Sequence, residues 1–283
     1  MEITYINDSG SRITLKQTKP FFLSSVSGTG QTKQTINTFT APMQDGAFYI
    51  SSALDMRNIT LEGTIASANS DLAYEYRKRL LRVFTPKLQG TLVYREKQIA
   101  CVVEEVLFTV SSREKNPKFY ISLLCPSPFF ESPDEVRKEL AVWSPLFSFR
   151  LEIPSTGMEF GERQPSQIIT VDNDGDVSCG CLIVFKALGG VENPELMNID
   201  TGEYVKINAT MSANEEIKIY THFAGKKVIR TVSQTESNAF SDLDTGSTFL
   251  QLNNGRNRLR YDAETNMDLL EVSIYYRPRF LGV

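Results

Sequence analysis

The feature that most constrains the fold is a succession of short β-prone segments with almost no helical pattern between them. Runs of Val, Ile, Thr, Tyr and Phe alternate with clusters of Gly, Asn, Asp, Pro and Ser, which is typical of strands separated by turns. Hairpins are expected around Asn7–Gly10 and Arg95–Gln98. Strands at this spacing, without the long helices of βαβ units, predict a mostly β protein built from sandwiches or barrels.

One segment departs from this pattern of short strands and predicts an α-helix. Ser70 is a candidate cap, Asp71 lies in the expected first turn, and Pro86 ends the pattern. The expected buried stripe consists of Leu72, Tyr76, Leu80 and Val83. The basic residues from Arg77 to Lys87 are interpreted as a solvated face or a contact with a neighbouring subunit. A second, weaker helix is expected over Asp134–Ala141.

A proline-rich stretch marks the expected domain boundary. Residues 126–133 contain three prolines, and 283 residues favour two domains. We expect a first domain at 1–130, a connector at 131–150 and a second domain at 151–283. Strand alternation predicts that the second core includes Phe185, Ile219, Phe249, Leu252 and Ile274.

Composition narrows the class of protein. The formal net charge of −4 argues against a free-standing nucleic-acid binder, and no apolar run is long enough to span a membrane. The first residues show no secretion signal. Four cysteines are too few for a disulfide scaffold, so we expect synthesis in a reducing cytoplasm.

The candidate chemical groups do not assemble into a site. His222 is the only histidine and has no nucleophile elbow to serve. Cys179 and Cys181 share a strand face but lack a second ligand pair, so core packing is the better interpretation. The segment Asp172–Asp176 fails the calcium-loop spacing and is interpreted as a hairpin turn. We therefore expect no enzyme, no catalytic residues, no cofactor and no bound metal.

The segment Phe21–Met56 is polar, rich in Ser, Thr, Gln and Gly, and yet carries many large apolar side chains. It can hardly bury them by itself, so they either cover a partner subunit or drape over their own domain. The candidate subunit-interface residues are Phe21, Phe22, Phe39, Met43, Phe48 and Tyr49.

A series of short motifs, in order, carries a family resemblance. In the first half these are the expected helix running into Thr85-Pro86 and the strand that ends in residues 125–130. In the second half they are Asn173-Asp174-Gly175-Asp176, Gly180, Ile183, Phe185, Asn193-Pro194, Asn198, Thr201-Gly202-Glu203, Asp242-Leu243, Ser247, Phe249-Leu250-Gln251-Leu252, Gly255-Arg256-Asn257, Ile274-Tyr275-Tyr276 and Phe280-Leu281-Gly282-Val283. Over nearly the whole length the chain resembles the distal tail proteins of siphophages and prophages of Gram-positive bacteria.

The resemblance implies an N-terminal split-barrel (RIFT-like) β domain with one helix and an extended arm, and a C-terminal galectin-like β-sandwich. It implies a virion protein of the phage tail tip, made in the bacterial host cytoplasm, that forms a homohexameric ring, singly or back to back. The implied partners are the major tail tube protein, the tail-associated or tail-tip protein and the receptor-binding proteins. No membrane and no sequence-specific nucleic acid is implied.

Two other classes remain open at this stage. A carbohydrate-binding adhesion module without catalysis also fits a chain of two β-domains that lacks a chemical site. A glycosidase fits less well, because no pair of carboxylates stands out in the sequence.

Overall fold

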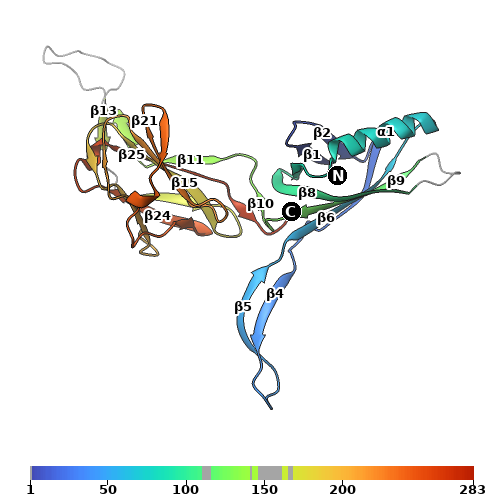
Figure 1. The fold of residues 1–283 in the computed structure, drawn as a ribbon, viewed down its shortest axis with the longest axis horizontal. Helices are drawn as coiled ribbons and strands as arrows, with labels where there is room; N and C mark the ends of the chain where they lie inside the picture. Colours follow the sequence, from blue (N-terminus) through green and yellow to red (C-terminus); the bar gives the residue numbers. More distant parts are fainter. Residues whose placement is uncertain (1, 110–115, 141, 146–160, 165–167) are drawn as a thin grey trace, which may run out of the picture. The chain divides into compact units, whose positions relative to one another are not determined.

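The computed structural model describes residues 2–109, 116–140, 142–145, 161–164 and 168–283, which form two compact units (Figure 1). The first unit comprises Met1–Pro133 together with Arg279–Val283, and the second comprises Asp134–Pro278. This division differs from the expected one at two places. Part of the expected connector belongs to the second unit as a strand, and the last five residues belong to the first unit. Both differences come from pairing between strands that are far apart in the sequence.

The first unit is a closed barrel. Its sheet runs β26-β10-β8-β7-β1-β2-β3-β6-β9, and a further pairing of β8 with β9 closes seven of these strands on themselves. The strands are β1 (Glu2–Asn7), β2 (Arg12–Lys16), β3 (Phe21–Ser27), β6 (Arg57–Ile65), β7 (Gln89–Tyr94), β8 (Lys97–Thr109), β9 (Lys118–Cys125), β10 (Phe130–Glu131) and β26 (Arg279–Phe280). The two predicted hairpins are confirmed, because β1 pairs with β2 and β7 pairs with β8.

Helix α1 (Ser70–Val83) is confirmed, with two corrections. Its N-cap is Asn69 rather than Ser70, since the Asn69 side chain accepts a hydrogen bond from the backbone N–H of Leu72 at 2.9 Å. Leu80 and Val83 lie in the barrel core as predicted, whereas Leu72 is 41% exposed. The buried stripe is therefore shifted, and Ala73 belongs to it in place of Leu72.

The second unit contains two main sheets around one core. One sheet runs β11-β25-β15-β20-β21-β22, with β23 pairing on β15, and the other runs β14-β24-β17-β18. The strands are β11 (Val136–Glu139), β14 (Ile168–Asn173), β15 (Cys179–Ala187), β17 (Glu195–Asn198), β18 (Tyr204–Lys206), β20 (Glu216–Tyr220), β21 (Lys227–Val232), β22 (Thr235–Asn238), β23 (Gln251–Leu252), β24 (Gly255–Asp262) and β25 (Leu270–Tyr276). Smaller pairings join β12 (Val142–Pro145) to β13 (Gly161–Gln164) and β16 (Val191–Glu192) to β19 (Thr210–Met211).

The core of this unit takes side chains from both sheets, as expected of a sandwich. Four of its predicted members, Phe185, Ile219, Leu252 and Ile274, are fully or almost fully buried. Phe249 is only partly buried and stacks on Phe240, with 6.0 Å between ring centroids. Strand alternation therefore located the core well.

The helix expected over Asp134–Ala141 is wrong. Residues Val136–Glu139 form strand β11, which pairs antiparallel with β25, while Ala141 lies outside the described residues. The start signal Ser132-Pro133-Asp134, on which the helix was predicted, did not distinguish a helix from an edge strand, and pairing with β25 selected the strand.

The segment Asp172–Asp176 contains the end of β14 and the turn that follows it, and this turn does not close the predicted hairpin. Asn173 is buried, accepts a hydrogen bond from the N–H of Gly175, and donates to the carbonyl oxygens of Val177 and Leu252. Strand β14 before the turn pairs with β24, and β15 after it pairs with β20 and β25. The turn therefore carries the chain from one sheet of the sandwich to the other.

Candidate functional site: an exposed hairpin arm

A two-stranded hairpin, here called the arm, leaves the barrel between β3 and β6. Strands β4 (Gln34–Phe39) and β5 (Phe48–Leu54) pair only with each other and lie outside the barrel sheet (Figure 1). The register pairs Phe39 with Phe48 and Gln34 with Leu54. A two-stranded hairpin is at best marginally stable in water, because it has no third layer to cover its side chains.

The arm exposes apolar side chains on both of its faces. Phe39 and Phe48 are cross-strand neighbours on one face, while Thr38 faces Tyr49 on the other. Ile36 shares the face of Thr38 because it lies two residues away on the same strand. The large apolar residues of the arm and its tip are each more than half exposed: Ile36, Phe39, Met43, Phe48, Tyr49 and Ile50.

The arm strands carry no charge. Neither Gln34–Phe39 nor Phe48–Leu54 contains Asp, Glu, Lys or Arg. Proteins usually protect exposed strand edges with charged side chains, prolines or bulges, because an unprotected edge pairs with other chains. A β-bulge between Asn37 and Thr38 is the device present in the arm. Uncharged edges with apolar residues on both faces are typical of a segment that is covered in an assembly.

The structure separates the predicted interface residues into two groups. Phe39, Met43, Phe48 and Tyr49 lie on the arm and are exposed. Phe21 is 3% exposed and packs in the barrel core, with its ring edge against Tyr76 at 5.7 Å between centroids, so its prediction as an interface residue is wrong. Phe22, the next residue of β3, points outward from the barrel and is 43% exposed.

Sequence reasoning missed three exposed residues of this region, which are Ile36, Ile50 and Met56. The predicted interface residues were aromatic residues and Met43, although Ile36 and Ile50 in the arm strands are equally apolar and exposed. A search for apolar residues of any kind within the charge-free strands would have found the first two.

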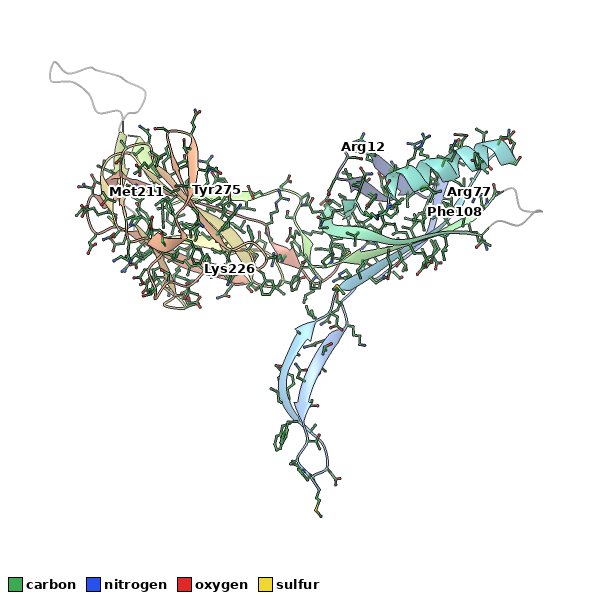
Figure 2. The ribbon with its side chains drawn as sticks, viewed as in Figure 1. Arg12, Arg77, Phe108, Met211, Lys226 and Tyr275 are labelled. Atoms are coloured by element: carbon green, nitrogen blue, oxygen red, sulfur yellow. The ribbon has the colours of Figure 1, made fainter. Side chains whose placement is uncertain are left out.

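The basic run on α1 lies over aromatic rings of the barrel. The guanidinium of Arg77 lies 5.0 Å from the ring centre of Phe108, and that of Arg79 lies 5.9 Å from Phe21; Figure 2 labels Arg77 and Phe108. Lys78 is 3.7 Å from the carboxylate of Glu75. These cation–π and ionic contacts account for much of the run within its own unit.

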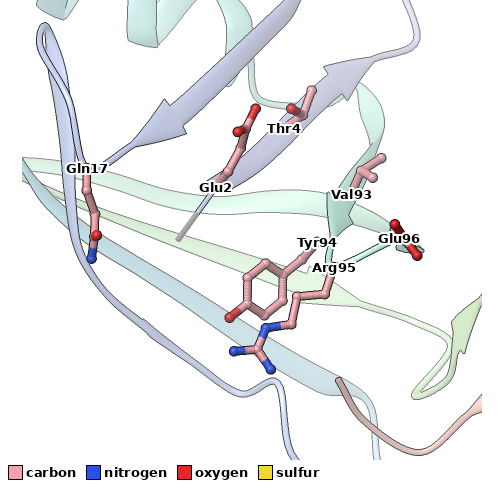
Figure 3. A pocket seen from close by; sticks show the side chains of 7 residues that line it. All are labelled: Glu2, Thr4, Gln17, Val93, Tyr94, Arg95 and Glu96. Carbon is pink, nitrogen blue, oxygen red and sulfur yellow. The ribbon is translucent and has the colours of Figure 1, made fainter.

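A shallow hollow of about 630 Å³ lies beside β1 and β7 (Figure 3). Its lining consists of Glu2, Thr4, Gln17, Val93, Tyr94, Arg95 and Glu96. Glu2 is paired with Lys16 at 2.9 Å, and the hydroxyl of Thr4 is hydrogen-bonded to that of Thr14 at 3.0 Å. Two of the lining side chains are therefore held by residues of β2.

The cysteines lie in the two cores. All four are buried and none forms a disulfide; burial raises the pKa of the Cys181 thiol to about 12, whereas a hydrogen bond with Thr221 acts to lower it. Thiols of this kind are poor nucleophiles and poor metal ligands at neutral pH. Among the described residues, no three His, Cys, Asp or Glu side chains come together as a metal site would require. In the same residues, no helix is long and apolar enough to cross a membrane.

Comparison with known proteins identifies the family to which both units are related. Two family models match in order: the phage tail protein RIFT-related domain over residues 8–125, and the siphovirus-type tail component C-terminal domain over residues 174–280. No curated protein sequence matches the chain.

Among solved structures, the Dit protein (gp 19.1) of phage SPP1 is similar, with a TM-score of 0.72 at 12% identity over 98% of this chain and 99% of that one. It is described as a paradigm of the hub adsorption apparatus in phages that infect Gram-positive bacteria. Chains of the phage P2 baseplate in its activated conformation, with Ca or with Sr, are similar at TM-scores of 0.51 and 0.50, with 10% and 11% identity over the full length of both chains. At such identities the likeness shows a shared fold. Since the two family domains follow one another and together span most of the sequence, this chain belongs to the siphovirus-type tail components and is a structural protein of the phage tail.

Proposed function

We propose that this tail protein is a non-enzymatic hub, in which six copies form a ring that joins the tail tube to the tail tip or baseplate. On this proposal the ring contacts the major tail tube protein on one side and the tail-associated and receptor-binding proteins on the other. The likeness to the SPP1 Dit hub and to P2 baseplate chains supports it. The described residues give no specific support to the alternative of a carbohydrate-binding adhesion module.

The observation that carries the proposal is the arm. Its strands are uncharged and apolar on both faces, whereas the barrel that bears it is closed and has its own core. The arm is therefore available to a neighbouring copy without loss of the barrel fold. We assign Phe39, Met43, Phe48 and Tyr49 as the contact residues and add Ile36 and Ile50.

The test measures ring formation by the purified full chain and by a variant of the arm face. Sedimentation over a wide concentration range and negative-stain electron microscopy should reveal six-fold rings of the parent protein. The double variant Phe39→Ser/Phe48→Ser should remain monomeric, since it removes the aromatic pair that we expect a neighbour to cover.

A matched control removes an exposed aromatic side chain from the other unit. Phe223 lies outside the described strands of the second unit and is more exposed than Phe39 and Phe48, so Phe223→Ser should assemble like the parent. Rings formed by the arm double variant would contradict the assignment of the arm. A parent protein that never forms rings, alone or in tail particles, would contradict the hub itself.

A further inference from the structure

A buried arginine lies at the root of the arm. Arg57 is the first residue of β6, at the point where the arm returns to the barrel, and it is 2% exposed. Burial lowers the pKa of its guanidinium, while nearby Cys125 acts in the opposite direction, and an arginine remains charged under such conditions. Among the ion pairs of the described residues, none involves Arg57. Backbone carbonyl oxygens take the place of a carboxylate.

Those carbonyls come from three separate segments. The guanidinium donates to Gly28 at 2.7 Å and also to Gly30, both of which lie where the arm leaves the barrel. It donates to Pro128 at 2.8 Å and to Leu281, near the end of the chain, at 2.6 Å. One side chain on the returning strand therefore holds the outgoing strand and the C-terminal segment together.

The backbones at this point approach one another closely. Gly28 has a φ of +82°, and a Cβ there would lie 2.0 Å from the carbonyl oxygen of Asn58, so only glycine fits. At Gly282 a Cβ would lie 2.8 Å from the carbonyl oxygen of Thr29. That same oxygen accepts a hydrogen bond from the N–H of Val283 at 3.0 Å. The C-terminal segment is thus packed directly on the outgoing root of the arm.

The C-terminal segment, Arg279–Val283, is anchored to the barrel by further contacts. Phe280 pairs with Phe130 in the β10–β26 ladder, and Arg279 lies 3.2 Å from the carboxylate of Glu131. The ammonium of Lys97 lies 3.4 Å from the ring centre of Phe280. Figure 1 marks the C-terminus beside β6 and β10, in agreement with these contacts. The segment directly follows Pro278, the last residue of the second unit.

We propose that Arg57 is the positioning residue of the arm, and that the docked C-terminal segment is the second half of the same clamp. The arm has no core of its own, so its direction depends on how its two roots are held. Release of the segment 279–283 would remove one of the three anchors of Arg57 and loosen the root. The consequence for ring formation rests on the proposed function, whereas the clamp itself does not.

Hydrogen exchange on the full chain, at a concentration where it is monomeric, tests the clamp. In Arg57→Met and in Gly282→Val, amides of residues 28–33, 54–56 and 280–283 should exchange on the order of tenfold faster, because local opening at the root becomes easier. The Asp55 amide, which donates to the carbonyl of Lys33, and the Val283 amide are the most direct reporters. Amides of β1 and β7 should keep the parent rates.

Two further variants separate positioning from general stabilisation. Arg57→Lys keeps the charge but loses the planar fork of donors, so its root should exchange at intermediate rates. Arg12→Met removes an exposed arginine from β2 of the same barrel and should leave all rates unchanged. Equal loss of protection in the root and in β1 and β7 would overturn the proposal, since Arg57 would then only stabilise the core. An unchanged root in Arg57→Met would overturn it as well.

The assembly readout distinguishes this proposal from the proposed function. A variant with a loosened root that still forms rings would support the clamp and show that ring formation does not depend on it. Failure of Phe39→Ser/Phe48→Ser to form rings, with no change in exchange for Arg57→Met, would overturn the clamp and leave the arm contact standing.

Discussion

Two antiparallel hairpins of this protein present opposite kinds of surface. The arm, β4–β5, has no charged residue in its strands, and its apolar side chains face solvent. The hairpin β21–β22 at the edge of the second unit contains Lys227, Arg230 and Glu236, and it buries Val228 in the core. Its tight turn, Ser233-Gln234, has two positive φ angles of 47° and 68°, as a two-residue hairpin loop requires.

The difference between the two hairpins shows how a strand at the edge of a sheet can be made compatible with solvent. Strand β22 ends its sheet with four exposed residues, none of them large and apolar, and Glu236 lies 3.8 Å from Lys218. Such an edge is compatible with solvent and discourages pairing with other chains. The arm lacks this protection, and a partner would have to supply the missing surface. If this comparison is right, substitutions in the arm change assembly and those in β21 change folding.

The largest expected effect is on the free energy of unfolding of the barrel unit. Leu80→Asp places an unpaired charge in the core of the first unit and should lower its free energy of unfolding by more than about 4 kcal/mol. Arg82→Ala, on the exposed side of the same helix, should change it by less than about 1 kcal/mol. Calorimetric melts compare the two variants, and equal melting temperatures would show that the helix face is wrongly assigned.

A direct contrast between the hairpins follows. Val228→Asp in β21 should destabilise the second unit by about 3 kcal/mol, because Val228 is buried. Ile36→Asp in β4 should change stability by less than about 0.5 kcal/mol, because Ile36 is exposed, yet it should prevent ring formation. Denaturant titration and sedimentation measure the two effects. A large loss of stability in Ile36→Asp would mean that the arm folds back onto its own unit.

Removal of an anchoring ion pair from β21 should have a smaller effect. Arg230 donates to the buried carboxylate of Glu215, and to the carbonyl of Thr210 at 2.8 Å. Arg230→Met should therefore cost about 1–3 kcal/mol in the second unit and leave ring formation intact. A double-mutant cycle with Glu215→Gln measures the coupling energy between the two side chains. A coupling energy near zero would show that this ion pair does not stabilise the hairpin β21–β22.

The smallest effect on folding should come from a charge placed on the arm edge. Thr38→Lys should leave the melting temperature unchanged but weaken association about tenfold, since a lysine on an edge strand opposes pairing with another chain. Thr235→Lys makes the same change on β22, where an edge already faces solvent, and should not affect association. Equal association constants for the two variants would contradict the proposal that the arm, and not β22, contacts another chain.

Local patterns in the chain were sufficient for much of the fold. The period of Leu80 and Val83 predicted α1, and alternation along β15, β20 and β25 predicted Phe185, Ile219 and Ile274 in one core. These predictions succeed because a buried helix or strand must repeat its apolar residues at its own period. The polar composition of residues 21–56, with its many large apolar side chains, predicted that a further surface must cover them, and four of the six candidates are exposed on the arm.

Other features depended on partners that lie far away in the sequence. Phe21 and Phe22 are adjacent and alike, and only closure of the barrel decides that Phe21 points inward. Residues 136–139 became a strand because β25 offers a free edge. The C-terminal segment belongs to the barrel because Arg57, Thr29 and Phe130 receive it there. The hydrophobic period of a segment depends only on its own residues, so the sequence predicts which helices and strands form. Strand pairing and buried contacts depend on segments that are distant in the sequence and meet only in the folded chain, so composition and periodicity do not predict them.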